Sequence, residues 1–449
     1  MTCTAVRMNP ATYGALPADA CTPATTGGVG PDRITRDSHD AVGRVIQTRR
    51  GVGTAQEQIY ATREYTPSGQ LAWVRDAANN RTTLEYDGFD RLSRLRYPVT
   101  TVGADASSTT DLEAYAYDQA SNRTRLWRRG QNPADPAQAI VYTYDALNRE
   151  TVRDYPGGTS MDVYTTYDLQ NRVLSARLVS TSGSGILATY DRAGRMLTEA
   201  TMGRTLTYQY DAASNRTRMT WPDGLYLQTD HDPASRPTAM RENGAASGPG
   251  VLASFAYDGL SRRTGLTRGN GTVTAYSFDT AGRLSGLTQD VASTAFDQAW
   301  TMAYNPAAQI AALDGWNSAW TAPPPAVPGG STAWAHDGLN RITGLSWDAR
   351  GNLIGDGTRT FTYDLENRLL NVTSGGINVA QLLYDPQGRP YRMGPSAAPV
   401  FTLYSGPMLV AEYDAGGTLL RRHVPGPGVD EPLVTYEGAG TTDRRWLHA

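Results

Sequence analysis

The 449-residue chain has only two cysteines, five histidines and six phenylalanines, and none of its 41 basic residues is a lysine. Histidine catalysis and metal binding by clustered Cys and His therefore have few residues to draw on. Charged residues make up 19% of the chain and the formal net charge is −3, which excludes a generally basic nucleic-acid-binding protein. No apolar run approaches the roughly 18 residues of a membrane span, so none is predicted.

The first ten residues, MTCTAVRMNP, lack the apolar core of a secretory signal peptide. We therefore expect any export signal to lie outside this sequence. Cys3 and Cys21 are 18 residues apart, and the sequence leaves two alternatives open for them, a local disulfide or two free thiols. Neither cysteine has a local signature of a catalytic nucleophile.

The chain is rich in the residues of strands and turns. It has 25 tyrosines, nine tryptophans and 46 glycines, together with many Thr, Ser and Asn. This composition favours many short strands joined by polar turns. The aromatic content is too high for a disordered protein, because so many rings need burial.

One short motif recurs along the chain: an aromatic residue, Asp, two variable residues, Gly, Asn or Ser, and then Arg. Eleven copies are strict, three read as carrying one extra residue before the Arg, and four are degraded. Eighteen copies give one per about 25 residues, which is typical of a repeated two-stranded unit. The sequence predicts a structural role for the motif residues Tyr86, Asp87, Arg91, Tyr144, Asp145, Arg149, Tyr167, Asp168, Arg172, Tyr190, Asp191, Arg195, Tyr257, Asp258, Arg262, Tyr363, Asp364, Arg368, Tyr384, Asp385 and Arg389.

The motif has the properties of a hairpin corner. Apolar and polar residues alternate ahead of each copy, which predicts a strand. Asp364 suits the first position of a type I turn, and Asn367 suits the left-handed residue that follows. This geometry places Asp364 opposite Arg368 and Tyr363 opposite Leu369. A single hairpin is marginal in water, so the repeats must stabilise one another.

The residue types used in catalysis are accounted for by the same motif. His39, His231 and His336 occupy its aromatic position, and the other two histidines, His423 and His448, have no nucleophile arranged around them. A turn role already explains each repeated Asp, so no metal site, cofactor or glycosidase pair is predicted. Each motif Arg is accompanied by an Asp, so little unpaired positive charge remains to bind nucleic acid. We therefore do not expect an enzyme.

The Tyr-Asp-x-x-Gly-Arg pattern resembles the YD repeats of the Rhs family, which are shared with the C components of bacterial Tc toxins and with the teneurins. The resemblance covers nearly the whole chain from about Asp32. Its most specific stretches are residues 347–370 (WDARGNLIGDGTRTFTYDLENRLL), similar to the family's paired repeats, and residues 423–438 (HVPGPGVDEPLVTYEG) followed by 444–449 (RRWLHA). The last two are similar to the entry of the Rhs-associated core.

The resemblance implies an all-β fold, in which a long antiparallel sheet of YD-repeat hairpins spirals into part of a hollow, cocoon-like shell. It divides the chain into an N-terminal lead-in segment (1–31) with the two cysteines, a repeat shell (32–422) and the start of the Rhs-associated core (423–449). In the family, the core continues into an aspartyl autoprotease that releases a C-terminal passenger. This sequence stops at Ala449, ahead of that cleavage motif, so we expect repeat wall without the protease.

The function implied is that of a structural shell or scaffold of an Rhs-type polymorphic toxin, which encapsulates or presents a C-terminal toxin passenger. Its expected partners are that passenger and further shell segments outside this chain. The expected location is secreted or on the surface of a bacterial cell. The alternative is a cell-surface adhesion or carbohydrate-binding protein, whose exposed aromatic residues would contact glycans.

Overall fold

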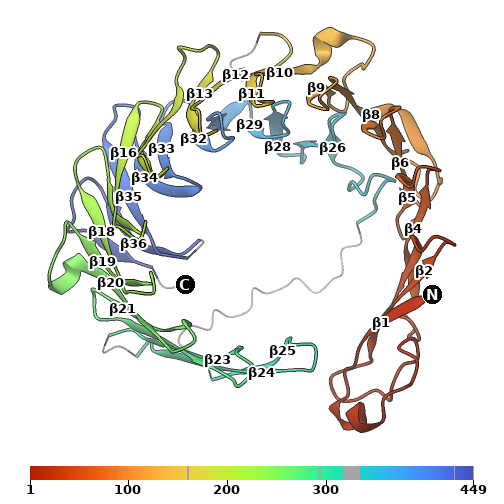
Figure 1. Ribbon diagram of the computed structural model, residues 1–449, viewed down its shortest axis with the longest axis horizontal. Helices are drawn as coiled ribbons and strands as arrows, with labels where there is room; N and C mark the ends of the chain where they lie inside the picture. Colours follow the sequence, from red (N-terminus) through yellow and green to blue (C-terminus); the bar gives the residue numbers. More distant parts are fainter. Residues whose placement is uncertain (159–160, 293–294, 316, 318–333, 429, 448–449) are drawn as a thin grey trace. The chain divides into compact units, whose positions relative to one another are not determined.

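The computed structural model describes residues 1–449 except 159–160, 293–294, 316, 318–333, 429 and 448–449. Regular structure in the described residues consists of β-strands and three short 3₁₀ helices, η1 (Pro10–Ala15), η2 (Pro136–Gln138) and η3 (Gly248–Gly250). This confirms the all-β prediction (Figure 1). No helix among these residues is long and apolar enough to cross a membrane.

Strands β1 to β25 form one long antiparallel sheet of 25 strands, in which hairpin follows hairpin along the chain. The strands are β1 (Thr2–Val6), β2 (Arg33–His39), β3 (Val45–Arg50), β4 (Gln58–Tyr65), β5 (Leu71–Arg75), β6 (Arg81–Tyr86), β7 (Leu92–Pro98), β8 (Ser107–Tyr117), β9 (Arg123–Trp127), β10 (Ile140–Tyr144), β11 (Glu150–Asp154), β12 (Val163–Tyr167), β13 (Val173–Leu178), β14 (Gly185–Tyr190), β15 (Met196–Thr201), β16 (Arg204–Tyr210), β17 (Arg216–Thr220), β18 (Tyr226–His231), β19 (Pro237–Glu242), β20 (Val251–Tyr257), β21 (Arg263–Arg268), β22 (Val273–Phe278), β23 (Leu284–Asp290), β24 (Gln298–Tyr304) and β25 (Ile310–Asp314).

Two smaller sheets follow. A five-stranded sheet contains β26 (Ser346–Trp347), β27 (Leu353–Gly355), β28 (Arg359–Tyr363), β29 (Leu369–Ser374) and β30 (Ile377–Gln381). A seven-stranded sheet contains β31 (Leu383–Tyr384), β32 (Pro390–Met393), β33 (Val400–Ser405), β34 (Met408–Tyr413), β35 (Leu419–Pro425), β36 (Pro432–Glu437) and β37 (Arg444–Trp446).

The chain divides into two compact units. The first consists of Met1–Ala139, Thr301–Asp314 and Pro323–Leu353, and the second of Ile140–Trp300, Gly315–Ala322 and Ile354–Ala449. The first unit therefore holds β1 to β9, and the second holds β10 to β23 and the seven-stranded sheet. The sequence-based division at residues 31/32 and 422/423 stays a prediction.

Buried and exposed residues alternate along the strands as the sequence predicts. In β16, Leu206 and Tyr208 are buried, whereas Thr205 and Thr207 are exposed. Side chains of a strand point alternately to its two faces, so one face of β16 is apolar and the other is polar. This confirms the period-two prediction for that segment.

The apolar face is covered by a second layer within the second unit. Leu206 and Leu266 of the long sheet belong to the same buried cluster as Leu403, Val434 and Tyr436 of the seven-stranded sheet. Figure 1 shows β33 to β36 (blue) lying against β16 to β21 (green). Removing both apolar faces from water stabilises this two-layer arrangement.

The N-terminal segment covers the first edge of the long sheet. Strand β1 pairs with β2, with Cys3 opposite Arg36, and a disulfide joins Cys3 to Cys21. The disulfide is the first of the two alternatives that the sequence left open. It fastens β1 to the loop beyond η1, so that the unpaired groups at the edge of β2 are satisfied by a tethered strand.

Leu403 provides a test of the two-layer core. It is fully buried between the sheets, so Leu403→Ala leaves a cavity and should destabilise the protein by about 2–5 kcal/mol. Chemical denaturation measures the change. The matched control is Leu260→Ala, at a position 75% exposed, which should change stability by less than about 0.5 kcal/mol. Equal effects of the two changes would contradict the packing described.

Candidate functional site

Every strict motif copy folds as the same hairpin corner, and residues 145–149 illustrate it. The Asp145 N–H donates to Arg149 O at 3.0 Å, and the Asn148 N–H donates to Asp145 O at 3.0 Å. The Asp145 carboxylate also accepts the Leu147 N–H at 2.9 Å. Asn148 has a φ of 60°, in the left-handed region that Asn and Gly tolerate. The register shifts just before Tyr144, which is the predicted bulge.

The Asp and Arg of each strict copy form a close ion pair. In the example, Arg149 Nε and Nη2 both lie 2.7 Å from Asp145 Oδ2. The same pair, at 2.5–2.7 Å, occurs in all eleven strict copies: 40/44, 87/91, 145/149, 168/172, 191/195, 232/236, 258/262, 279/283, 337/341, 364/368 and 385/389. Tyr363 faces Leu369, as predicted.

Most motif arginines also reach the next repeat. The Arg149 guanidinium carbon lies 4.7 Å from the centre of the Tyr167 ring, and Arg149 Nη1 donates to Asp168 O at 2.9 Å. The Tyr167 hydroxyl returns a hydrogen bond to Glu150 O at 2.8 Å. One arginine therefore contacts an acid in its own corner and a ring and a carbonyl in the next. We call this set of contacts the brace.

The brace recurs along the chain. The stacking distance from guanidinium carbon to ring centre is 4.4–5.1 Å for the pairs Arg91–Tyr117, Arg172–Tyr190, Arg195–Tyr210, Arg236–Tyr257, Arg262–Phe278, Arg368–Tyr384 and Arg389–Tyr404. Sequence reasoning paired each Arg only with its own Asp and missed the ring of the following repeat. The exclusive use of Arg was the available signal, since a planar cation stacks and a lysine ammonium does not.

The prediction that three copies carry an extra residue before the Arg is wrong. Asn80 Nδ2 donates to Asp76 Oδ2 at 3.0 Å, and Asn122 and Asn215 make the same bond to Asp118 and Asp211 at 2.9 and 2.8 Å. Asn therefore takes the place of the motif Arg, and no residue is inserted. A side-chain amide supplies the donor that the corner needs but carries no charge.

The corner lowers the pKa of its carboxyl group. The hydrogen bond from the Arg149 side chain is the largest favourable cause for Asp145, followed by backbone N–H donors, and together they hold its pKa below the usual value. Arg91 does the same to the pKa of Asp87. These carboxylates are ionised and engaged at neutral pH, so they are poor candidates for general acids.

The interface between the two layers of the second unit contains buried polar groups. Glu199 lies on β15 and is 4% exposed, and its carboxylate accepts from the Tyr208 hydroxyl at 3.1 Å, Gly406 N at 3.1 Å and Arg389 Nη1 at 3.2 Å. Arg389 is a motif arginine, so here the repeat also holds the second layer. A buried carboxylate with this many donors is satisfied and specifies how the layers meet.

A second acid, Glu242 at the end of β19, binds the seven-stranded sheet in the same way. Its Oε2 accepts from the Tyr436 hydroxyl at 2.6 Å and from Arg444 Nη2 at 2.8 Å. Burial is the main cause that raises the pKa of Tyr436, and the Glu242 charge adds to it. Tyr436 therefore keeps its proton and serves as a donor.

The histidines lie where their sequence positions place them. His39 and His231 end strands before corners, and His336 forms a bridge with Ile342 across its own corner. His423 on β35 lies 3.0 Å from Thr435 Oγ1 and 3.0 Å from Glu412 Oε1. His448 lies outside the described residues. In the part of the chain that the structure describes, no cluster of three His, Cys, Asp or Glu residues could hold a metal ion.

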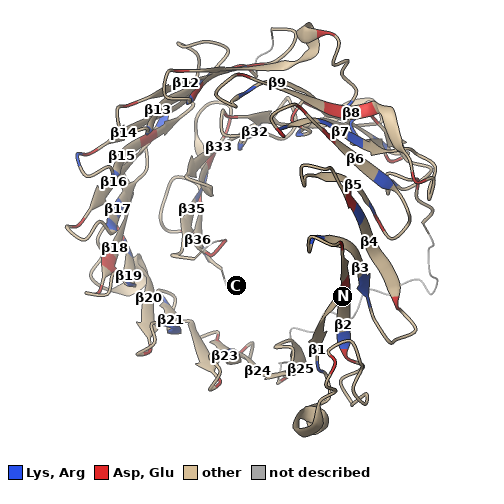
Figure 2. Ribbon diagram, turned by 45° about the vertical axis from the view of Figure 1, so that its right-hand side comes forward, with Lys and Arg blue, Asp and Glu red and all other residues tan. Residues whose placement is uncertain are grey.

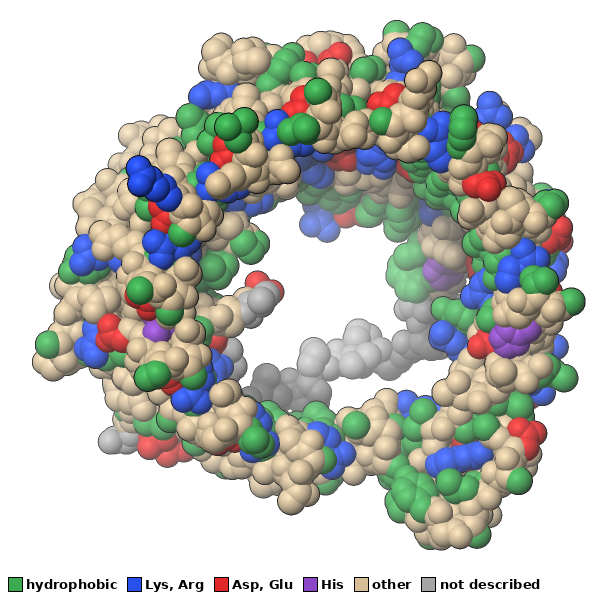
Figure 3. Space-filling model, viewed as in Figure 1, with side chains coloured by type: hydrophobic (Ala, Val, Ile, Leu, Met, Phe, Trp, Pro, Cys, Tyr) green, Lys and Arg blue, Asp and Glu red, His purple; other side chains and the backbone are tan. Residues whose placement is uncertain are grey.

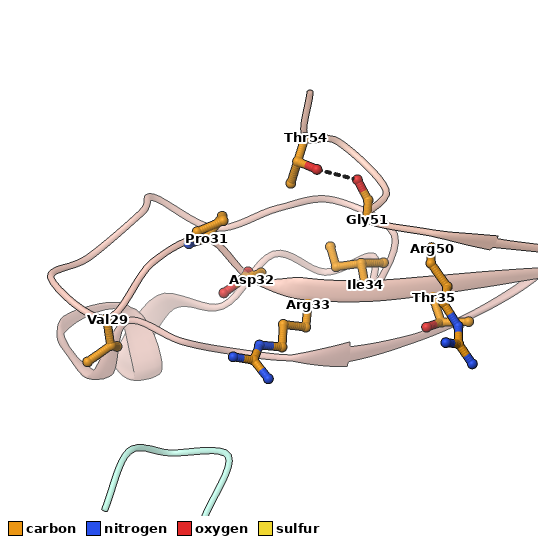
Figure 4. Close-up of a pocket in the computed structure, with 9 residues that line it drawn as sticks. All are labelled: Val29, Pro31, Asp32, Arg33, Ile34, Thr35, Arg50, Gly51 and Thr54. Atoms are coloured by element: carbon orange, nitrogen blue, oxygen red, sulfur yellow. Dashed lines mark hydrogen bonds between the residues drawn. The ribbon is translucent and has the colours of Figure 1, made fainter. Parts of the chain in front are cut away.

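A surface pocket lies beside the lead-in segment of the first unit, lined by residues between Val29 and Thr54 (Figure 4). Its one carboxylate, Asp32, accepts from Arg7 Nη1 at 2.7 Å, Met8 N at 2.9 Å and Ala24 N at 2.8 Å. These donors keep the pKa of Asp32 low although burial opposes them. Asp32 therefore holds the lead-in segment in place by accepting three of its hydrogen bonds.

Charges of both signs are distributed along the strands (Figure 2) and are interspersed on the face visible in Figure 3. This distribution follows from the corner, because each motif Arg lies beside an Asp. A surface of mixed charge has no extended field of one sign to attract a polyanion.

The brace can be tested at Arg149. Arg149→Ala removes the ion pair, the ring contact and the donor to Asp168 O, and should lower the melting temperature by about 1–4 °C. Arg149→Lys should lose most of the same stability, because an ammonium cannot stack and donate in a fork. Arg192→Ala, at an exposed corner tip, is the matched control and should leave the melting temperature unchanged. Equal melting temperatures for all variants would contradict the brace.

The lowered pKa of the motif carboxyls predicts a pH dependence. An Asp with a lowered folded pKa stabilises the protein above its unfolded pKa of about 4, and this contribution disappears as pH falls through the folded value. The melting temperature of Asp145→Asn should therefore lie below that of the wild type at pH 7. The difference should shrink as the pH falls below the unfolded pKa of about 4, as followed by circular dichroism. A difference that does not change with pH would contradict ionic pairing at Asp145.

Comparison with known proteins identifies the repeat. A family model described as RHS Repeat matches residues 190–226, which contain the two consecutive corners 191–195 and 211–215. No curated protein matches the chain in sequence.

Among solved structures, the chain is similar to a TcdB2-TccC3 complex, with 12% identity, a TM-score of 0.39, and coverage of 90% of this chain and 27% of that chain. It is also similar to the Photorhabdus luminescens Tc holotoxin pore with a TccC3 mutation, with 14% identity, a TM-score of 0.41, and coverage of 94% and 23%. The chain spans about a quarter of the length of these solved chains.

The family match therefore falls on the hairpin corner and its continuation, the unit that recurs through the described residues with the same ion pair and the same stacked ring. Residues 190–226 therefore carry an RHS repeat, and the YD-type corner that it contains recurs along the described residues.

Proposed function

We propose that this chain is a structural wall of an Rhs-type polymorphic toxin, which encloses or presents a C-terminal toxin passenger. The brace carries the proposal. In the corner 145–149 and its neighbour, the Asp, the Arg and the aromatic residue are the groups that could act in chemistry, and all three are engaged in holding neighbouring hairpins together. The Asp–Arg pair occurs in all eleven strict copies, and the ring contact recurs in most of them. The repeated residues therefore serve to build an extended sheet, and we propose no enzymatic role for them.

The proposed partners are the toxin passenger and further wall segments on other parts of the toxin. The relatives' titles describe a complex of TcdB2 with TccC3 and a holotoxin pore, and we propose an assembly of that kind for this chain. The Cys3–Cys21 disulfide is compatible with a secreted or cell-surface location, where oxidising conditions maintain disulfides.

The glycan-binding alternative receives less support from the contacts. Sugar binding by aromatic residues needs an accessible ring face, but the repeat rings are covered on one face by guanidinium groups, as Tyr167 is by Arg149. Exposed aromatic residues remain elsewhere, Phe89 and Tyr60 among them, and Tyr60 is itself stacked on Arg50. Binding to a glycan array that is lost on mutating Phe89 would favour the alternative.

A protected-reporter experiment tests enclosure. An unfolded, epitope-tagged reporter with a single site for a sequence-specific protease is joined after Ala449, and its rate of cleavage is compared with that of the free reporter. Enclosure predicts cleavage that is several-fold slower, because an enclosed chain must escape before the protease can bind it.

The matched control carries the same reporter ahead of Met1, where no protection is expected. A second control heats the fusion above its melting temperature, which should restore fast cleavage. Cleavage of the folded C-terminal fusion at the rate of the free reporter would contradict enclosure.

A further inference from the structure

The hairpins of the second unit have turns of two kinds, one kind at each end of their strands. Strands β10 to β23 are antiparallel and follow one another in order, so every motif corner lies at one edge and every intervening loop lies at the other. We call them the motif edge and the loop edge. The motif edge consists of the corners 145–149, 168–172, 191–195, 211–215, 232–236, 258–262 and 279–283.

Later corners of the chain dock on the loop edge of earlier hairpins. In the second unit, the Tyr155 hydroxyl, just beyond β11, donates to Glu366 Oε1 in the corner 364–368 at 3.0 Å. Arg389, in the corner 385–389, reaches Glu199 on β15 at 3.2 Å. A motif edge and a loop edge therefore form a natural pair within this unit.

The first unit repeats the arrangement with its own residues. The Gly338 N–H, in the corner 337–341, donates to Thr100 O in the loop after β7 at 2.7 Å. The fit is close, since a Cβ on Gly338 would lie 2.3 Å from Val99 O. Beyond β9, a Cβ on Gly130 would lie 2.8 Å from Ala349 Cβ of the corner 348–352. Small residues and glycines let the two edges meet.

In the second unit, burial of the corner Asp separates docked corners from the others. The side chains of Asp364 and Asp385 in the docked corners are 1% and 0% exposed. The equivalent side chains of Asp145 and Asp258, at the motif edge of β10 to β23, are 26% and 23% exposed. The same motif is therefore covered in one row and bare in the other.

The bare motif edge has the composition of a contact surface. Its seven corners have three central residues each, and of these 21 residues only Arg192 is charged; the others read ALN, LQN, AG, AAS, PAS, GLS and TAG. Small, uncharged tips cost little to remove from water.

The second unit also has a bare loop edge that could receive it. The loops after β29 (Gly375–Gly376) and after β32 (Pro395–Ala398) are exposed and carry no charge. Nothing lies within 4 Å of a Cβ placed on Gly375 or Gly376, so the space that Ala349 fills at Gly130 is open here. One chain therefore carries both halves of the contact that it already uses internally.

We propose that this chain associates head to tail with a second copy of itself, with the motif edge of residues 145–283 of one copy docked on the loops 375–376 and 395–398 of the next. Because the two surfaces differ, each copy leaves one of them free, and assembly can continue beyond a dimer. The inference goes beyond the proposed function and requires no passenger.

Sedimentation velocity of the full chain over a wide concentration range tests the association. The wild type should form oligomers whose size grows with concentration. Leu169→Arg places a charge in the contact and should weaken association by at least about tenfold, and Leu147→Arg should do the same. The matched control, Leu16→Arg, changes an exposed residue of the lead-in segment and should associate like the wild type. Circular dichroism checks that each variant is folded.

A mixing experiment tests the head-to-tail geometry. Ala397→Arg blocks the loop surface and leaves the motif edge intact, whereas Leu169→Arg does the reverse. Each variant alone should remain monomeric, and an equimolar mixture should form one-to-one dimers and nothing larger.

Three results would overturn the proposal: a wild type that stays monomeric at all concentrations, an association that Leu169→Arg leaves unchanged, or a mixture that forms no dimer. The second result would point to the unpaired strand edges instead. None of these results bears on protection of a C-terminal reporter, so this inference and the proposed function can fail separately.

Discussion

The structure depends on an arginine that most of the repeats contain and that binds two partners at once. Arg149 forms an ion pair with Asp145 four residues earlier and stacks on Tyr167 of the next hairpin. The first contact closes a corner, and the second joins that corner to its neighbour. An isolated two-stranded hairpin is marginal, so the second contact turns a series of weak units into a continuous sheet. Each pair alone is modest and partly exposed, and stability comes from repetition.

Covering the apolar face is a separate requirement. In the second unit, the seven-stranded sheet provides that cover, and its contacts combine buried aliphatic residues with acids such as Glu199 and Glu242. The apolar residues supply most of the stabilisation, because burial from water is the dominant favourable effect. The acids decide the register of the layers, since each would be left unsatisfied if the sheets slid past one another.

The repeat also explains why one motif serves two surfaces. A corner presents small, uncharged tips, and these tips dock where a loop offers a glycine or a carbonyl, as Gly130 and Thr100 do. The same tips are bare along β10 to β23. A protein built from identical corners therefore carries identical contact surfaces, and whether one of them is used depends on what lies beside it.

The sequence by itself determined the local structure: the alternating strands, the corner with a left-handed Asn148, and the Asp145–Arg149 pair. These features depend on residues within five positions of one another, so periodicity and turn chemistry predict them. The sequence pattern led to a wrong interpretation of Asn80, Asn122 and Asn215. Only the hydrogen bonds show that an amide has replaced the motif Arg in these copies. Tertiary structure alone decided which ring each arginine stacks on, which sheet covers Leu206, and which corners dock, because those contacts join residues about 20 to 200 positions apart and no local pattern encodes the partner.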